Sequence, residues 1–141
     1  IGESDKIYEK FNGSTIGETL LTPTRIYVKP MLALFNEVTV KAVSHITGGG
    51  FYENIPRSIP EGFSVKIDEK SLRILPIFEL IEKTGNISRR DMYNTFNMGV
   101  GMTLVLAKED ADKAIKILEA NGENPYVMGE IVESQEGVII C

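Results

Sequence analysis

A short stretch of this sequence, residues 45–57 (HITGGGFYENIPR), combines groups suited to binding an anion. Glycine has no Cβ atom, so a ligand can come close to the backbone N–H groups of residues 48–50. A glycine-rich turn that leads into a helix also directs free N–H groups and the positive end of the helix dipole at one spot. Arg57 adds a planar cation that matches two phosphate oxygens. His45, the only histidine of the chain, can exchange a proton near neutral pH. The stretch predicts an oxyanion site with a proton-transfer candidate at its edge.

A purely structural explanation of the same residues is also open. Three glycines after a strand more often form a tight turn than a phosphate cradle, and this stretch matches neither the P-loop nor the dinucleotide-binding pattern. A lone histidine at the end of a strand is more often packed or hydrogen-bonded than catalytic. Residue types and spacing alone therefore support an anion-binding hypothesis and nothing finer.

Two other places carry polar groups next to backbone-directing residues. Thr22 and Thr24 lie on either side of a proline, where turn and cap chemistry competes with ligand contact. Asn97 precedes Gly99 and Gly101, whose small size lets the backbone pass close to a neighbouring strand or to a ligand. Both places are binding candidates with a structural alternative.

Composition limits the possible partners. The net charge is −5, and hydrophobic residues make up 43% of the 141 residues. An acidic balance argues against general nucleic-acid or anionic-membrane binding, which requires a basic surface. No apolar run reaches the ~18 residues of a membrane span, and no Cys/His cluster suggests a metal site. Cys141 is the only cysteine, so no internal disulfide can form, which fits a cytoplasmic protein.

The length predicts one domain over residues 1–141, with residues 1–16 as a weakly assigned lead-in. The first residues have no signal-peptide pattern. The sequence begins with isoleucine and lacks an initiator methionine, so we expect a piece of a longer protein.

Hydrophobic periodicity and turn residues predict alternating strands and helices. Helical segments are expected at 5–11, from 30 onwards, at 51–59, 76–85, after Ser88 and at 109–121; strands are expected at 38–44, 63–68, 102–107, 126–132 and 138–140, with 25–28 a strand or an extended lead-in. This order predicts an α+β fold in which helices pack in layers on a mixed β-sheet.

Three stretches, in the same order, resemble one protein family. They are residues 17–29 (GETLLTPTRIYVK), residues 45–57 and residues 92–102 (MYNTFNMGVGM). The sequence resembles the C-terminal domain of phosphoribosylformylglycinamidine cyclo-ligases, also called aminoimidazole ribonucleotide synthetases, over roughly residues 17–132. The resemblance implies a layered, partly ferredoxin-like arrangement within the α+β class.

The resemblance also implies a function. The family closes the imidazole ring of formylglycinamidine ribonucleotide with ATP, giving aminoimidazole ribonucleotide, ADP and phosphate in purine biosynthesis. It implies ATP and Mg²⁺ bound mainly through an N-terminal domain that this sequence lacks, and a homodimer when the protein is full length. His45 becomes the catalytic candidate. The substrate and phosphate candidates are Thr22, Thr24, Thr47, Gly48, Gly49, Gly50, Asn54, Arg57, Asn97, Gly99 and Gly101.

Two other functions compete with this one. Another enzyme of the same two-domain superfamily, such as a selenophosphate synthetase or a thiamine-phosphate kinase, would share the fold. A non-enzymatic module that binds phosphate or a nucleotide would also need one anion loop and no catalysis. An upstream half carrying acidic metal ligands would favour an enzyme, and an unrelated upstream half would favour the module.

Overall fold

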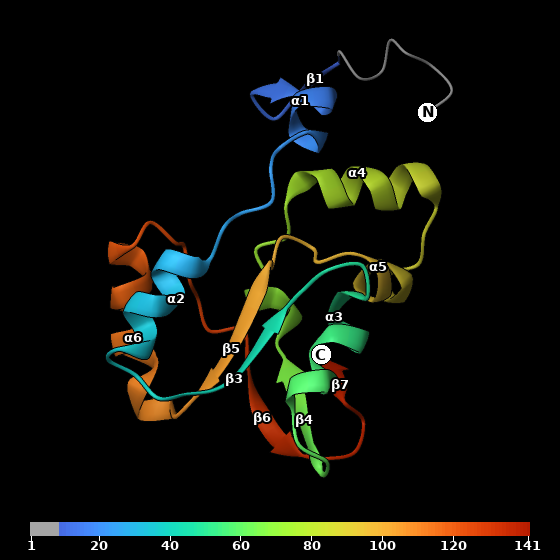
Figure 1. Ribbon diagram of the computed structural model, residues 1–141. Coiled ribbons are helices and arrows are strands. Elements are labelled where there is room, and N and C mark those ends of the chain that lie inside the picture. The colour runs from blue at the N-terminus through green and yellow to red at the C-terminus, as the bar shows by residue number, and fades with distance from the viewer. Residues whose placement is uncertain (1–8) are drawn as a thin grey trace.

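The computed structural model describes residues 9–141, which fold as a mixture of short helices and three small β-sheets (Figure 1). This arrangement confirms the predicted α+β class. The strands are β1 (Lys10–Phe11) paired with β2 (Ser14–Thr15), β3 (Val40–His45) paired with β5 (Met102–Leu106), and a three-stranded sheet of β6 (Gly129–Glu133), β4 (Phe63–Ile67) and β7 (Val138–Ile140).

The three-stranded sheet is mixed, because its central strand β4 runs antiparallel to β6 and parallel to β7. Val65 lies opposite Ile131 on one side and Val138 on the other. Alternating apolar residues predicted this strand. The predicted strand at 126–132 begins only at Gly129, where a Cβ atom would run into the carbonyl group of Lys66.

The β3–β5 pair carries a separate layer of two helices, α2 (Val28–Phe35) and α6 (Ala111–Ala120). Met31 and Leu34 of α2 pack with Ala114 and Leu118 of α6 in a small core. The predicted helix at 109–121 is confirmed, with a 3-10 turn (Lys108–Asp110) before it. Helix α2 begins at Val28, two residues before the predicted start.

The larger core lies where α3 (Gly50–Asn54) and α5 (Arg89–Thr95) meet the three-stranded sheet. Phe51 of α3, Met92 of α5 and Ile67 of β4 are fully buried there. The predicted helix at 51–59 is a helix followed by a 3-10 turn (Pro56–Ser58). Another 3-10 turn (Glu69–Ser71) follows β4.

Helices α4 (Pro76–Gly85) and α5 show how local chemistry sets the helix ends. The hydroxyl of Ser88 accepts the N–H of Asp91, so the predicted N-cap of α5 is confirmed. The predicted helix at 76–85 is confirmed as α4. Gly85 is the last helical residue, and Asn86 takes the left-handed conformation at φ +49°, which asparagine tolerates because its short side chain can hydrogen-bond locally.

The N-terminal part forms a local unit that lies apart from the two larger sheets (Figure 1). Helix α1 (Ile16–Leu20) is capped by Thr15, whose hydroxyl accepts the N–H of Glu18, and it has no buried residue. The predicted helical turn at 5–11 falls partly outside the described residues, and Lys10–Phe11 form strand β1 instead. The segment 22–27 then leads to α2 without regular structure, in place of the predicted strand or lead-in at 25–28.

Candidate functional site

The glycine turn, residues 47–50, is a closed turn between β3 and α3. The N–H of Gly50 donates to the carbonyl oxygen of Thr47 at 2.9 Å, which closes the turn. The N–H of Thr47 donates to Asn54 Oδ1 at 2.7 Å. Asn54 is buried, so its side chain supports the turn from behind. Within residues 9–141, the amides of Gly48 and Gly49 donate no hydrogen bond to the protein, and they lie outside any helix or strand.

The three glycines meet different surroundings. Gly50 has φ +55°, and a Cβ atom there would run into the carbonyl oxygen of Tyr93 in α5. A Cβ atom on Gly49 would meet Glu53 and Asn54 at 2.8 Å, whereas one on Gly48 would point into open space. Packing therefore explains Gly50 and Gly49, and Gly48 marks the open side of the turn.

Arg57 lies in the 3-10 turn that follows α3. Its Nη2 pairs with Glu53 Oε2 at 3.2 Å, and both side chains are largely exposed. An exposed pair at this separation contributes little to stability. A phosphate could replace the carboxylate as the partner of Arg57 at small cost.

His45, the last residue of β3, has an exposed side chain whose ring meets the ring of Tyr27 edge to face, with centroids 6.0 Å apart. Tyr27 also fills the space beside Gly101, where a Cβ atom would collide with the tyrosine hydroxyl. Partial burial raises the pKa of Tyr27 above its usual value. Sequence reasoning missed Tyr27, although it lies inside one of the three resembled stretches.

The loop of residues 97–101 approaches the glycine turn through the backbone. The N–H of Ile46 donates to the carbonyl oxygen of Gly101 at 2.9 Å. Asn97 Oδ1 accepts the N–H of Gly99 at 3.0 Å, so this side chain shapes its own loop. Gly99 has φ +96° and would meet the side chain of Leu75 at 3.0 Å if it carried a Cβ atom. The structure thus joins the second and third resembled stretches at the end of β3.

The two threonine candidates lie on the segment between α1 and α2. The hydroxyl of Thr22 donates to the carbonyl oxygen of Glu18 at 3.3 Å, which is the cap chemistry that competed with ligand contact. Thr24 is exposed. An ion pair of 2.7 Å between Arg25 and Glu123 ties the segment to the loop after α6. The end of this segment, at Tyr27, touches His45.

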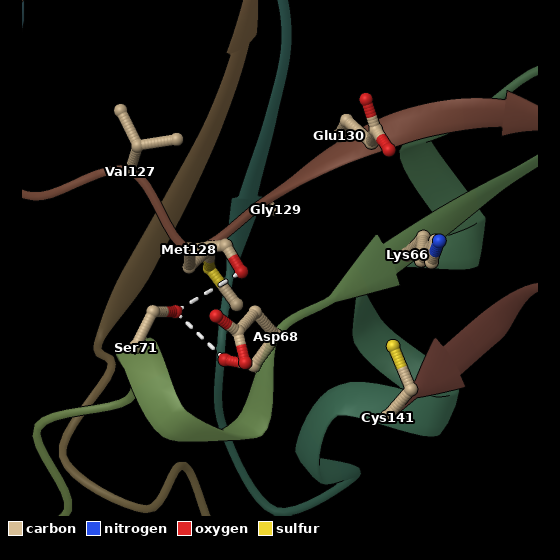
Figure 2. A pocket seen from close by; sticks show the side chains of 8 residues that line it. All are labelled: Lys66, Asp68, Ser71, Val127, Met128, Gly129, Glu130 and Cys141. Carbon is tan, nitrogen blue, oxygen red and sulfur yellow. Dashed lines mark hydrogen bonds between the residues drawn. The ribbon is translucent and has the colours of Figure 1, made fainter.

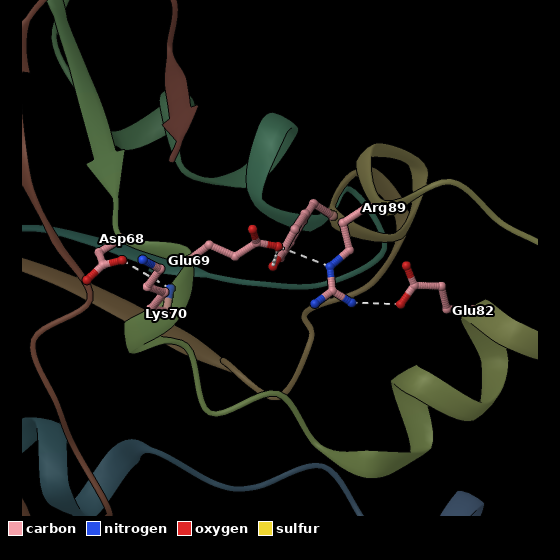
Figure 3. A network of polar contacts seen from close by, with 6 residues as sticks. Asp68, Glu69, Lys70, Glu82 and Arg89 are labelled. Carbon is pink, nitrogen blue, oxygen red and sulfur yellow. Dashed lines mark hydrogen bonds and ion pairs between the residues drawn. The ribbon is translucent and has the colours of Figure 1, made fainter.

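A polar network that sequence reasoning missed supports the glycine turn from the α5 side (Figure 3). The hydroxyl of Tyr93 donates to Glu69 Oε1 at 2.9 Å, and Arg89 Nε donates to the same oxygen at 3.1 Å. Arg89 also reaches Glu82 of α4 at 2.7 Å. The ring of Tyr93 stacks on Phe51 with centroids 5.4 Å apart. Glu69 thereby fixes the part of α5 on which Gly50 rests.

The surroundings of the network shift the pKa values of Glu69 and Tyr93 in opposite directions. Hydrogen bonds from Arg89 and then from Tyr93 lower the pKa of Glu69. Burial, followed by the hydrogen bond to Glu69, raises the pKa of Tyr93 far above its usual value. The tyrosine is therefore a neutral donor and the glutamate a charged acceptor at neutral pH.

A hollow of about 430 Å³ lies elsewhere, where β4 and β6 meet the C-terminal residue (Figure 2). Lys66 of β4 and Glu130 of β6 lie opposite each other in the sheet. The hydroxyl of Ser71 donates to the carbonyl oxygens of Asp68 and Met128 at 2.7 and 3.2 Å. None of the predicted site residues lines this hollow.

The described residues offer neither a metal-binding cluster nor a membrane-spanning helix. Residues 9–141 contain no group of three or more His, Cys, Asp or Glu side chains placed to hold a metal ion. In the same residues, no helix has both the length and the apolar character needed to cross a membrane.

Comparison with known proteins gives close relatives. A family model described as "AIR synthase related protein, C-terminal domain" matches residues 1–141. The phosphoribosylformylglycinamidine cyclo-ligase of Caldicellulosiruptor saccharolyticus is 48% identical over 135 residues, covering 96% of this chain and 39% of that protein. The protein of the same name from Lachnoclostridium phytofermentans is 50% identical over 135 residues, covering 95% of this chain and 39% of that protein. The chain thus spans about two fifths of the length of these relatives.

Solved structures give a more distant likeness. The hydrogenase maturation protein HypE of E. coli superposes with a TM-score of 0.67 at 21% identity, covering 89% of this chain and 39% of that one. A second HypE structure from the same organism gives a TM-score of 0.63 at 19% identity, covering 89% and 40%. At these identities the likeness shows the fold alone.

Proposed function

This chain belongs to the family of AIR synthase related protein C-terminal domains, and we propose that it is the C-terminal part of a phosphoribosylformylglycinamidine cyclo-ligase. The observation that carries the proposal is the 48% identity to such a ligase over 96% of the chain. Family membership also confirms the resemblance first stated from three short stretches. The complete protein would convert formylglycinamidine ribonucleotide and ATP to aminoimidazole ribonucleotide, ADP and phosphate.

The proposed reaction places specific demands on the site. The formyl amide oxygen is a poor leaving group, so phosphoryl transfer from ATP first converts it to an iminophosphate. The amidine nitrogen then attacks the same carbon, the C–O bond breaks and phosphate leaves with the bonding electrons. Such chemistry depends on positioning and on stabilising the charge of the moving phosphoryl group.

We assign the phosphate-binding role to the glycine turn and Arg57. The amides of Gly48 and Gly49 donate no hydrogen bond within the described residues, and Gly48 faces open space. Arg57 has only an exposed carboxylate as its partner. Asn54 and Gly50 support the turn rather than contacting the ligand, since one is hydrogen-bonded behind it and the other packs on α5.

We assign proton transfer to His45 and substrate contacts to the groups around it. The hydrogen bond from Ile46 to Gly101 and the contact of Tyr27 with His45 support a common site, because they link the three resembled stretches. Thr47, Asn97 and Gly99 would line this site through their backbones. Thr22 and Thr24 would reach it from the segment that ends at Tyr27.

We further propose that ATP and Mg²⁺ bind mainly through the part of the protein that precedes this chain. The relatives support this division, because the chain covers only 39% of their length. By the same resemblance, the complete protein would be a cytoplasmic homodimer.

Product formation by the complete protein tests the proposal. Purified full-length protein, given formylglycinamidine ribonucleotide, ATP and Mg²⁺, should form aminoimidazole ribonucleotide and ADP in equal amounts, measured by chromatography. Residues 1–141 alone should form neither product above background. A full-length protein that hydrolyses ATP but never closes the ring would instead be another enzyme of the superfamily.

A further inference from the structure

Helix α2 is apolar on nearly every side. Its sequence, VKPMLALF, contains one charged residue, Lys29. Met31 and Leu34 lie in the small core with α6. A second face consists of Val28, Leu32 and Phe35, whose spacing of four and three residues aligns them on the helix surface. We call these three residues the outer face of α2.

The outer face of α2 is uncovered in this chain. Val28 is 63% exposed, Leu32 59% and Phe35 51%. A helix that is hydrophobic all round is normally buried inside a larger protein. Exposed apolar patches on soluble proteins commonly mark sites of interaction with other protein surfaces.

The chain that leads into α2 continues the same pattern. Leu20, Leu21 and Ile26 are also exposed, and α1 buries none of its residues. In residues 9–141, six of the ten exposed large hydrophobic residues lie between positions 20 and 35. Exposed apolar side chains are therefore concentrated in the N-terminal elements of the described chain.

We propose that the outer face of α2, together with Leu20, Leu21 and Ile26, is the docking surface for the part of the longer protein that precedes this chain. The inference rests on the proposed function. Three observations select this occupant over a second copy of the chain. The relatives extend well beyond the 39% of their length that matches, the matched family is a C-terminal domain, and the exposed residues lie on the elements nearest the preceding segment.

This surface also adjoins the candidate site. Tyr27 lies between Ile26 and Val28 in the chain, and its ring contacts His45. A domain seated on the outer face of α2 would therefore stand next to His45. Docking at this surface would bring the proposed ATP-binding part up to the groups that act on the ribonucleotide.

Thiol labelling of the full-length protein tests the docking surface. In a Cys141→Ser background, Leu32→Cys should react with a maleimide ~10-fold or more slower than the same variant unfolded in denaturant, because the side chain is covered. The matched control is Val127→Cys, at a position 60% exposed on the loop before β6. That thiol should react at nearly its unfolded rate. Mass spectrometry identifies the labelled cysteine.

Two outcomes would overturn the docking surface. Equal, fast labelling of Leu32→Cys and Val127→Cys would show that α2 stays exposed in the complete protein. Protection that disappears on dilution would assign the face to a second copy of the protein.

The labelling result is independent of catalysis. Protection of Leu32→Cys, together with a native full-length protein that closes no ring, would refute the proposed function and keep the docking surface. Ring closure by a protein in which Leu32→Cys is unprotected would keep the proposed function and refute the docking surface.

Discussion

At the residue scale, several candidate ligands turn out to have structural partners. Asn54 accepts the N–H of Thr47, and Asn97 accepts the N–H of Gly99. Gly50 allows the turn to touch the backbone of α5. The candidate groups with open surroundings include Gly48, His45 and Arg57. Ligand contact should therefore depend on these open positions, and stability on the packed ones.

Substitutions within the glycine turn should separate the two roles. Gly50→Ala should lower the free energy of unfolding by at least ~2 kcal/mol, because a Cβ atom would collide with Tyr93 and the backbone has a positive φ. Gly48→Ala should change stability by less than ~0.5 kcal/mol, since its Cβ atom would meet nothing. Denaturant unfolding of both variants measures the difference. Equal losses would contradict this assignment.

Phosphate should perturb the glycine turn itself. Titration with inorganic phosphate, followed by NMR, should shift the amides of residues 47–51, because Gly48 and Gly49 offer N–H groups without protein acceptors in the described chain. Gly48→Val should weaken the shifts by crowding the open side of the turn. Shifts confined to the start of α6 would place the anion elsewhere.

Replacing His45 should affect turnover more than stability. In the full-length protein, His45→Asn should lower turnover by ~10²-fold if the imidazole transfers a proton. The melting temperature should change little, because the side chain is exposed and contacts Tyr27 only edge to face. Steady-state kinetics and a thermal melt give both values. A destabilised variant with near-normal turnover would mean that His45 only packs.

At the element scale, the site depends on α5 as much as on the glycine turn. Helix α5 carries Tyr93, whose carbonyl faces Gly50 and whose ring stacks on Phe51. The same helix leads directly into the loop of residues 97–101. Glu69 holds Tyr93 through its hydroxyl. The 3-10 turn after β4 therefore helps to set the distance between the two candidate loops.

Local patterns in the sequence predicted most of these elements and few of their partners. Alternation predicted β4, and a serine cap predicted the start of α5, because both depend on neighbouring residues. The pairing of β3 with β5 and the bond from Tyr93 to Glu69 join residues far apart in the chain. Periodicity contains no information on such pairs. The support of the glycine turn could therefore not be predicted from the sequence.

Removing one hydroxyl from α5 should move the glycine turn. Tyr93→Phe keeps the ring on Phe51 but loses the bond to Glu69, so amide resonances of residues 47–50 should shift without any ligand. Stability should fall by only ~0.5–1.5 kcal/mol. Tyr126→Phe is the matched control, because its hydroxyl accepts the N–H of Arg73 instead. Shifts restricted to the neighbours of Glu69 would show that the network does not reach the turn.

The same network should give an acid-dependent contribution to stability. Hydrogen bonds from Arg89 and Tyr93 lower the pKa of folded Glu69 below its ordinary value of 4.5. The charged form therefore stabilises the fold above that value, and the contribution is lost as pH falls through the lowered pKa. Compared with Glu69→Gln, the native chain should keep its advantage at neutral pH and lose it progressively as the pH falls below 4.5. A difference in the free energy of unfolding between the native chain and Glu69→Gln that stays constant with pH would contradict this. The advantage should be modest, because the Glu69 side chain is 41% exposed.

At the scale of the whole molecule, residues 9–141 contain two hydrophobic cores and an uncovered apolar face on α2. The cores close around α3 with α5 and around α2 with α6. The outer face of α2 and the exposed leucines before it have no counterpart within residues 9–141. The candidate site adjoins this uncovered side through Tyr27 and His45. The two cores therefore form within this chain, whereas the candidate site lies next to a surface that the chain does not cover itself.

Two separately produced halves should therefore regain activity when they are mixed. Residues 1–141 and the preceding part should each close no ring alone, and the mixture should do so at a rate that saturates with the concentration of either half. Leu32→Asp should raise the half-saturating concentration of this chain by ~10-fold or more, because it places a charge within an apolar interface. Val127→Asp, at an equally exposed position, should leave the half-saturating concentration unchanged. If both substitutions act alike, the two halves meet at another surface, and the outer face of α2 does not hold the site together.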